Sequence, residues 1–368
     1  MTLLTFIAGL IGLILGADLL VRGASKLALS FGISPLVVGL TIVAFGTSAP
    51  ELAVSVGAVL DGKTDIAIGN VVGSNIFNVL LVLGVSALII PLVVNIQLIR
   101  QEVPIMIGAS LLLLALTLDG QLSQFDGALL FALMVAYTVF LIVQSRAETA
   151  ATQATHAAKS DYDLELNPTQ AVGWDAKLPV QLLLIVVGLG FLVLGSEWLV
   201  SASVIFAKSL GVSDLVIALT IVAAGTSMPE VATSVVAAIK GERDIAVGNV
   251  VGSSTFNILG CLGAAGLVSG DLGLVMPAAM LNFDIWVMIA VALACLPVFI
   301  TGYEIARWEG GVFVAYYAAY VAYLVLATQQ HAALDQFSFA MVGFVIPLTV
   351  VTLIVVFLRR AKPSEISS

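Results

Sequence analysis

The chain has 368 residues, of which 60% are hydrophobic and only 10% are charged, whereas an average soluble domain carries about 25% charged residues. A mean hydropathy of +1.14 agrees with a chain that lies largely in lipid, and 14 Lys and Arg against 23 Asp and Glu exclude the basic surface of a nucleic-acid-binding protein. We therefore interpret the chain as a polytopic, all-α membrane protein.

Eleven apolar segments are interpreted as membrane-spanning helices, each of which needs about 20 apolar residues. The first segment lacks the basic start and the small-residue cleavage site of a signal peptide, so we expect it to remain as a spanning helix. The predicted spans cover residues 3–22, 35–60, 66–90, 103–118, 126–144, 179–200, 213–239, 245–269, 283–301, 311–328 and 339–358.

A long polar stretch divides these spans into groups. Residues 146–178 form the predicted cytoplasmic linker between a first five-helix unit (1–145) and a second five-helix unit (179–330), and residues 331–368 add the eleventh span and a basic tail. Lys and Arg residues gather on the cytoplasmic side of membrane proteins. With the N-terminus outside, twelve of them lie in cytoplasmic segments and two lie outside, which predicts an N-out, C-in topology.

An internal repeat relates the two five-helix units. A shift of 179 residues aligns residues 40–84 with their copy at 29 identities in 45 positions. Because each copy contributes five spans, an odd number, the second copy crosses the membrane in the opposite sense. Inverted repeats are typical of transporters that bind their substrate near the midplane, at the repeat interface. Packing alone gives no reason for the matched Thr, Ser, Pro, Glu and Asn residues.

Polar residues and a proline occupy the middle of the second and seventh spans. A carboxylate at the bilayer centre costs about 2.5 kcal/mol or more, so two at matched positions indicate a functional site. Each proline removes a backbone donor, and we expect the helix to open there and turn carbonyls near Ala44 and Ala223 toward a cavity. The matched residues are Thr47, Ser48, Pro50 and Glu51, and Thr226, Ser227, Pro229 and Glu230.

The third and eighth spans supply a second set of oxygen ligands. Asn78 and Asn257 lie at their midpoints, and Ser74 and Ser253 lie one helical turn earlier on the same face. Calcium takes about six to eight oxygen ligands in flexible geometry. The sequence shows no convergent His or Cys residues for zinc, copper or iron. Two glutamates balance one Ca²⁺ or are shared by two or three Na⁺, so the two ions exclude each other, as an exchanger requires.

The motifs GTSAPE with GNVVGSNIFN, repeated as GTSMPE with GNVVGSSTFN, resemble the two alpha-repeats of the cation/Ca²⁺ exchanger superfamily. They are most similar to those of prokaryotic-type members of its sodium/calcium exchanger branch. The resemblance implies a sodium/calcium antiporter of the prokaryotic inner membrane, not an enzyme, with no cofactor or protein partner. It also implies alternating access, in which the first and sixth spans form a sliding pair. It implies an ion site formed by Glu51, Glu230, Thr47, Thr226, Ser48, Ser227, Ser74, Ser253, Asn78 and Asn257, with backbone carbonyls of Ala44 and Ala223.

The coupling ion stays open at this point. Asn257 stands where some members of the superfamily carry Asp, so potassium dependence is an alternative, and proton coupling is another because a buried glutamate can carry a proton. A remote alternative is an intramembrane hydrolase. The sequence argues against it, because it shows no Ser/His pair, no HExxH helix and no aspartate dyad on facing spans.

Two further pairs of residues, one of acids and one of cysteines, lie in or beside the spans. Asp18 and Glu197 occupy matched positions late in the first and sixth spans, and a gating or ion-entry role competes with a simple pair between Asp18 and Arg22. Cys261 and Cys295 lie in apolar runs and are expected to be buried small side chains.

Overall fold

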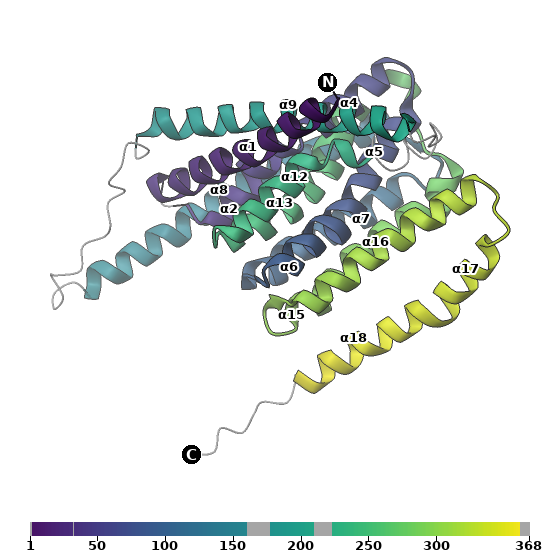
Figure 1. The fold of residues 1–368 in the computed structure, drawn as a ribbon. Helices are drawn as coiled ribbons and strands as arrows, with labels where there is room; N and C mark the ends of the chain where they lie inside the picture. Colours follow the sequence, from purple (N-terminus) through teal and green to yellow (C-terminus); the bar gives the residue numbers. More distant parts are fainter. Residues whose placement is uncertain (1, 32, 160–176, 210–222, 361–368) are drawn as a thin grey trace.

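The computed structural model describes residues 2–31, 33–159, 177–209 and 223–360. These residues form a bundle of long helices (Figure 1). Helices suit this apolar chain because every backbone donor and acceptor inside lipid must find a partner within the protein.

In the first of the two predicted units, several short π-helical stretches lie inside the longer helices. The elements of this unit are α1 (Thr2–Phe31), α2 (Pro35–Val38), η1 (Gly39–Val43), α3 (Ala44–Thr47), α4 (Ala49–Leu60), α5 (Thr64–Phe77), η2 (Asn78–Leu83), α6 (Gly84–Ile89), β1 (Leu92–Val93), η3 (Leu98–Glu102), α7 (Val103–Leu116), β2 (Gln121–Leu122) and α8 (Gln124–Lys159).

The second unit shows the same order wherever it is described. It contains α9 (Leu178–Ser209), α11 (Ala223–Gly225), α12 (Met228–Ile239), α13 (Arg243–Phe256), η6 (Asn257–Leu262), α14 (Gly263–Val268), η7 (Gly270–Leu272), β3 (Leu274–Val275), η8 (Met280–Asp284), α15 (Ile285–Ile300), β4 (Glu304–Ile305) and α16 (Arg307–Thr328). The C-terminal elements α17 (Leu334–Ala340), η9 (Met341–Val345) and α18 (Ile346–Arg360) run along the outside of the bundle beside α16 (Figure 1).

The membrane-spanning character predicted from the sequence is confirmed. In the described part of the chain, nine helices are long and apolar enough to cross a membrane, and a tenth results when the bent pair Pro35–Thr47 and Ala49–Leu60 counts as one span. The predicted seventh span, 213–239, begins outside the described residues, and α12 is its described end. The total of eleven spans therefore stays a prediction. α8 continues to Lys159, so the linker expected from residue 146 starts as helix.

α1 and α9 lie side by side with their backbones in direct contact (Figure 1). A Cβ atom added to Gly16 would lie 2.7 Å from Gly188 O, and one added to Gly195 would lie 2.7 Å from Leu13 N. Small residues at such positions let two helices approach closely inside a membrane. The two helices are therefore packed as one unit.

The centre of the bundle is built from matched helices of both units. Every residue of α13 and η6 from Ile245 to Leu262 is buried. Tight turns join α4 to α5 and α12 to α13, and each contains a glycine with positive φ, Gly62 at +74° and Gly241 at +82°. A side chain would strain the backbone there. These turns place the glutamate-bearing helix of each unit against the helix that carries its Ser and Asn residues.

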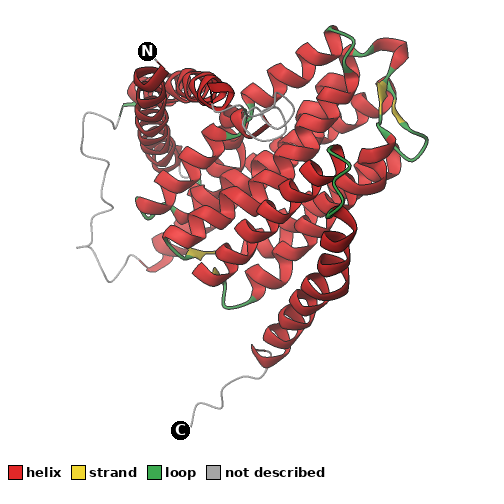
Figure 2. Ribbon diagram, turned by 45° about the vertical axis from the view of Figure 1, so that its right-hand side comes forward, coloured by secondary structure: helices red, strands yellow, loops and turns green. Residues whose placement is uncertain are grey.

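Two short antiparallel strand pairs connect the units among the described residues. β1 of the first unit pairs with β4 of the second, and β2 of the first pairs with β3 of the second. Figure 2 shows the two pairs at opposite ends of the bundle. Each unit therefore contributes one strand to each end.

Candidate functional site

The helix that carries GTSAPE breaks in the middle of the predicted second span. α3 ends at Thr47, α4 begins at Ala49, and the two parts meet at an angle of 44°. Ser48 between them has φ −84° and ψ 6°, and Ser227 has nearly the same conformation in the second unit, with φ −91° and ψ 9°. The proline that follows each serine fits the first turn of the next helix, where its missing N–H costs nothing. The predicted break of the second span is confirmed, and the described part of the seventh span has a turn at the matched residues Thr226 and Ser227.

The carbonyls near the breaks accept hydrogen bonds from side chains. Ala44 O accepts from Ser253 Oγ at 3.4 Å and also keeps its helical bond from Ser48 N at 3.0 Å. Gly225 O has no helical donor, because Pro229 lacks a backbone N–H. It accepts instead from the hydroxyl of Ser196 on α9. Ala223 begins α11 at the edge of the described residues.

Glu51 and Glu230 are both fully buried, and each accepts a hydrogen bond from the other unit. Ser227 Oγ donates to Glu51 Oε1 at 2.8 Å, and Ser48 Oγ donates to Glu230 Oε1 at 3.0 Å. The serine of each break thus binds the glutamate of the opposite break. Both carboxylates are therefore held by hydrogen bonds across the interface between the units.

Two more hydroxyl groups, both on the central helices, extend these bonds. Ser74 Oγ on α5 lies 3.1 Å from Ser227 Oγ, and Ser253 Oγ on α13 lies 3.4 Å from Glu230 Oε1. Thr47 Oγ1 lies 3.4 Å from Ser253 Oγ. Hydrogen bonds therefore place seven of the predicted residues in two groups, one around each carboxylate, and we call the two groups together the oxygen cluster: Glu51 with Ser227 and Ser74, and Glu230 with Ser48, Ser253 and Thr47.

Several polar atoms of the cluster and its surroundings have no hydrogen-bond partner although they are buried. They include Glu51 Oε2, Glu230 Oε2 and both amide atoms of Asn78. Asn257, the matched residue in the second unit, differs. Its Nδ2 donates to Asn75 Oδ1 at 3.2 Å, and its Oδ1 lies 3.7 Å from Cys261 Sγ. The two asparagines are therefore matched in sequence but not in bonding.

The reason for this difference is one substitution between the repeats. Asn75 of the first unit bonds Asn257 and also donates to Ser254 O at 3.1 Å. The matched residue, Ser254, donates its hydroxyl to Val250 O on its own helix at 2.9 Å. Ser254 therefore gives Asn78 no partner.

Two asparagines of the motifs were not expected to take part and do. Asn249 Oδ1 accepts from Thr47 Oγ1 at 3.0 Å, and Asn70 Oδ1 accepts from Thr226 Oγ1 at 3.4 Å. Each asparagine belongs to the unit opposite its threonine. The signal that could have found them was available, because the GN pair opens the third-span and eighth-span motifs at matched positions.

Asp18 and Glu197 lie away from the oxygen cluster. Asp18 forms an ion pair with Lys240, at the end of α12, and Lys240 also donates to Asp18 O. Glu197 is exposed on α9. The ion pair with Lys240 joins α1 to the glutamate-bearing segment of the second unit.

The two cysteines are buried, as the sequence predicted. Both Cys261 and Cys295 are free. In the part of the chain that the structure describes, no group of three or more His, Cys, Asp and Glu residues is arranged to hold a metal ion. The oxygen cluster consists of carboxylate and hydroxyl oxygens, which suit hard cations such as Ca²⁺ and Na⁺.

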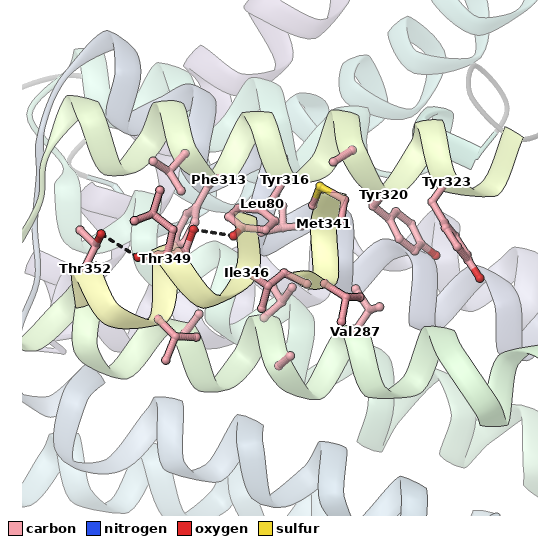
Figure 3. A pocket seen from close by; sticks show the side chains of 18 of the residues that line it. Leu80, Val287, Phe313, Tyr316, Tyr320, Tyr323, Met341, Ile346, Thr349 and Thr352 are labelled. Carbon is pink, nitrogen blue, oxygen red and sulfur yellow. Dashed lines mark hydrogen bonds between the residues drawn. The ribbon is translucent and has the colours of Figure 1, made fainter. Parts of the chain in front are cut away.

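A cavity of about 480 Å³ lies elsewhere, between α15, α16 and the C-terminal helices (Figure 3). Its wall is mainly apolar and aromatic, and Tyr316 on α16 crosses it to donate to Thr349 Oγ1 at 2.6 Å. None of the predicted ligand residues lines it. The cavity is therefore separate from the oxygen cluster.

Two further carboxylates, the buried Glu102 and the partly buried Asp284, were not singled out from the sequence. Glu102 accepts a hydrogen bond from Tyr137 at 2.6 Å, and Asp284 accepts one from Tyr320 at 2.8 Å. Each carboxylate ends a π-helical stretch, η3 or η8, at the same place in its unit. These pairs tie neighbouring helices together within each unit, and their acids are already partnered.

The sequence is similar to known membrane proteins. The chain matches the family model described as sodium/calcium exchanger protein over residues 1–143 and 180–326. It is 34% identical to the sodium/calcium exchanger MaX1 of Methanosarcina acetivorans over 348 residues, which cover 87% of this chain and 97% of that protein. It is 36% identical to the inner membrane protein YrbG of Escherichia coli over 290 residues, which cover 78% of this chain and 87% of that protein.

A solved structure shows the same fold. The sodium-calcium exchanger NCX_Mj, soaked with Na⁺ and Sr²⁺, superposes with a TM-score of 0.72 at 30% identity, over 87% of this chain and 97% of that chain. The family match ends at residue 326. The C-terminal elements α17, η9 and α18 therefore follow the part that the family shares.

Proposed function

The chain belongs to the sodium/calcium exchanger family, and from this we propose that it exchanges Na⁺ for Ca²⁺ by alternating access at the oxygen cluster. The observation that carries the proposal is that Glu51 and Glu230 are fully buried while each keeps one carboxylate oxygen without a hydrogen-bond partner. Leaving a buried polar atom unpaired costs about 1–3 kcal/mol, and more for a charged group. A bound cation offsets this cost at both oxygens at once.

The charge of the cluster supports mutual exclusion of the two ions. Two carboxylates carry two negative charges, which one Ca²⁺ balances and which two or three Na⁺ can share. The remaining ligands are neutral oxygens. Because the same oxygens serve both ions, the protein holds either Ca²⁺ or Na⁺ but not both.

The proposed ligands are the residues predicted from the sequence, but the two asparagines differ in how available their amide groups are to an ion. Asn78 has both amide atoms free to face an ion, whereas the amide of Asn257 is engaged by Asn75 and Cys261. Asn78 is therefore the stronger ligand of the two. The full set is Glu51, Glu230, Thr47, Thr226, Ser48, Ser227, Ser74, Ser253, Asn78 and Asn257, with the carbonyls of Ala44 and Ala223.

The proposed topology is two inverted five-helix repeats with an added C-terminal span, N-out and C-in. The strand pairs support it, because β1 and β3 are counterparts in the two units, as are β2 and β4, and the counterparts lie at opposite ends of the bundle (Figure 2). An inverted repeat produces this arrangement. The protein is an integral membrane protein, and the similarity to an inner membrane protein of E. coli favours the prokaryotic inner membrane.

Alternating access requires part of the protein to move against the glutamate-bearing helices. We assign this role to α1 and α9, whose glycine-lined contact makes them one unit. α9 reaches both breaks. A Cβ atom added to Gly46 would lie 2.7 Å from Leu189 Cδ2, and one added to Gly225 would lie 2.6 Å from Val200 Cγ2. A shift of α9 along its axis therefore changes what covers each break.

Ion fluxes in liposomes test the coupling ion. Protein reconstituted into sodium-loaded vesicles is expected to take up Ca²⁺ when the vesicles are diluted into sodium-free buffer, because Na⁺ leaves the site that Ca²⁺ then occupies. A potassium gradient or a pH gradient alone is expected to give the rate of empty vesicles. Uptake driven equally well by the pH gradient without sodium would contradict sodium coupling and favour exchange of Ca²⁺ for protons.

A further inference from the structure

We propose that Asn70 and Asn249 are positioning residues that orient the hydroxyl groups of Thr226 and Thr47 for cation binding. The proposal rests on the proposed function, because it concerns how the ion site is prepared. Neither asparagine is itself among the proposed ligands. Their role follows from the direction of the hydrogen bonds they form.

Each asparagine bridges the two units. Asn249 on α13 is fully buried; its Oδ1 accepts from Thr47 Oγ1 at 3.0 Å and its Nδ2 donates to Ser234 Oγ at 3.0 Å. Ser234 lies on α12, one turn after Glu230. Asn249 therefore connects the break of the first unit to the glutamate-bearing helix of the second.

Asn70 repeats this pattern and shows which way its amide must face. Its Nδ2 donates to Glu51 O at 3.2 Å and to Ser55 Oγ at 3.0 Å. A carbonyl oxygen can only accept, so the NH₂ group must face α4 and Oδ1 must face Thr226. The hydroxyl of Thr226, 3.4 Å from that oxygen, therefore donates its proton to Asn70.

The direction of these bonds decides what the threonines offer an ion. A hydroxyl group has one proton and two lone pairs. When its proton is directed to the amide oxygen, both lone pairs stay available for a cation, which binds through oxygen lone pairs. Without the amide acceptor, the hydroxyl can rotate and point its proton toward the cation. The two asparagines thus hold the hydroxyl protons of both threonines away from the cation, so that the oxygen lone pairs face it.

A double-mutant cycle tests this role for Asn249. Asn249→Leu removes the acceptor and keeps the approximate volume, and it is expected to raise the apparent KM for Ca²⁺ in sodium-driven uptake about fivefold, the effect of one hydrogen bond, with little change in maximal rate. If Asn249 acts through Thr47, adding Asn249→Leu to Thr47→Val raises KM no further. Independent effects that multiply in the double variant would overturn the proposal.

Controls separate folding from positioning. Ser254→Ala removes a buried hydroxyl that bonds only its own helix at Val250 O, and its KM is expected to equal that of the wild type. If Asn249→Leu does not accumulate as folded protein, the cycle of Asn70→Leu with Thr226→Val, both only partly buried, decides the question in the same way.

A parallel measurement on Glu51→Gln separates this inference from the proposed function. If Glu51→Gln exchanges Ca²⁺ normally, the proposed site itself is wrong, and the positioning role falls with it. If Glu51→Gln is inactive while the asparagine and threonine variants act independently, the ion site stands and only the positioning role is overturned.

Discussion

Replacing Glu51 with glutamine is expected to abolish sodium-driven Ca²⁺ uptake. The substitution keeps the shape of the side chain and the acceptor for Ser227, but it removes one of the two charges that balance a divalent ion. Removing one partner of a buried charge pair costs about 2–5 kcal/mol, so the apparent affinity for Ca²⁺ falls by about thirtyfold to several thousandfold. Radioactive Ca²⁺ uptake into sodium-loaded proteoliposomes measures the loss, and Glu230→Gln is expected to match it.

The matched control is a carboxylate outside the cluster. Glu304 lies on β4, and Glu304→Gln makes the same chemical change away from the oxygen cluster. Its uptake is expected to stay near that of the wild type. Normal uptake by both Glu51→Gln and Glu230→Gln would show that neither carboxylate binds the transported ion.

A large residue at Gly195 is expected to separate α1 from α9 and to stop transport. A Cβ atom there would lie 2.7 Å from Leu13 N and 2.9 Å from Gly9 O, both backbone atoms that cannot move aside alone. Overpacking a tight contact costs about 1–3 kcal/mol, and a leucine adds several atoms to this position. Gly195→Leu is therefore expected to lower the midpoint of thermal unfolding by several degrees and to remove Ca²⁺ uptake. Size-exclusion chromatography of heated samples measures the midpoint.

The same helix offers the control. A Cβ atom at Gly190 meets nothing within 4 Å, so Gly190→Leu is expected to change stability by about 0.5 kcal/mol or less and to keep transport. Equal effects of the two substitutions would mean that the change in helix composition, and not the contact with α1, is responsible.

The repeat predicted much of the site because symmetry and spacing are visible in sequence. Prolines after Ser48 and Ser227 predicted the two breaks, and the helical spacing of Ser74 and Asn78 predicted which residues share a face. The structure brings the glutamates and serines together at the interface between the units. Which donor reaches which carboxylate depends on packing between units, so the bonds from Ser227 to Glu51 and from Ser48 to Glu230 were beyond a sequence pattern.

The differences between the repeats were the least predictable part. Asn78 and Asn257 look equivalent in sequence, yet only Asn257 has an asparagine partner, Asn75. The residue matched to Asn75 in the second unit is Ser254, which is shorter and bonds its own helix. Glu102 lies at the edge of an apolar segment, where an acid usually faces water. Its burial depends on Tyr137, a partner 35 residues away. Such partners become visible only once the helices are packed.

Equilibrium binding to the purified protein tests mutual exclusion most directly. Radioactive Ca²⁺ bound at a fixed concentration is measured while Na⁺ is raised at constant ionic strength, with choline in place of sodium as the control. Because both ions use the oxygens of Glu51 and Glu230, Na⁺ is expected to displace Ca²⁺ completely and cooperatively, while choline displaces none. Bound Ca²⁺ that persists at saturating Na⁺ would contradict a single site shared in turn by the two ions.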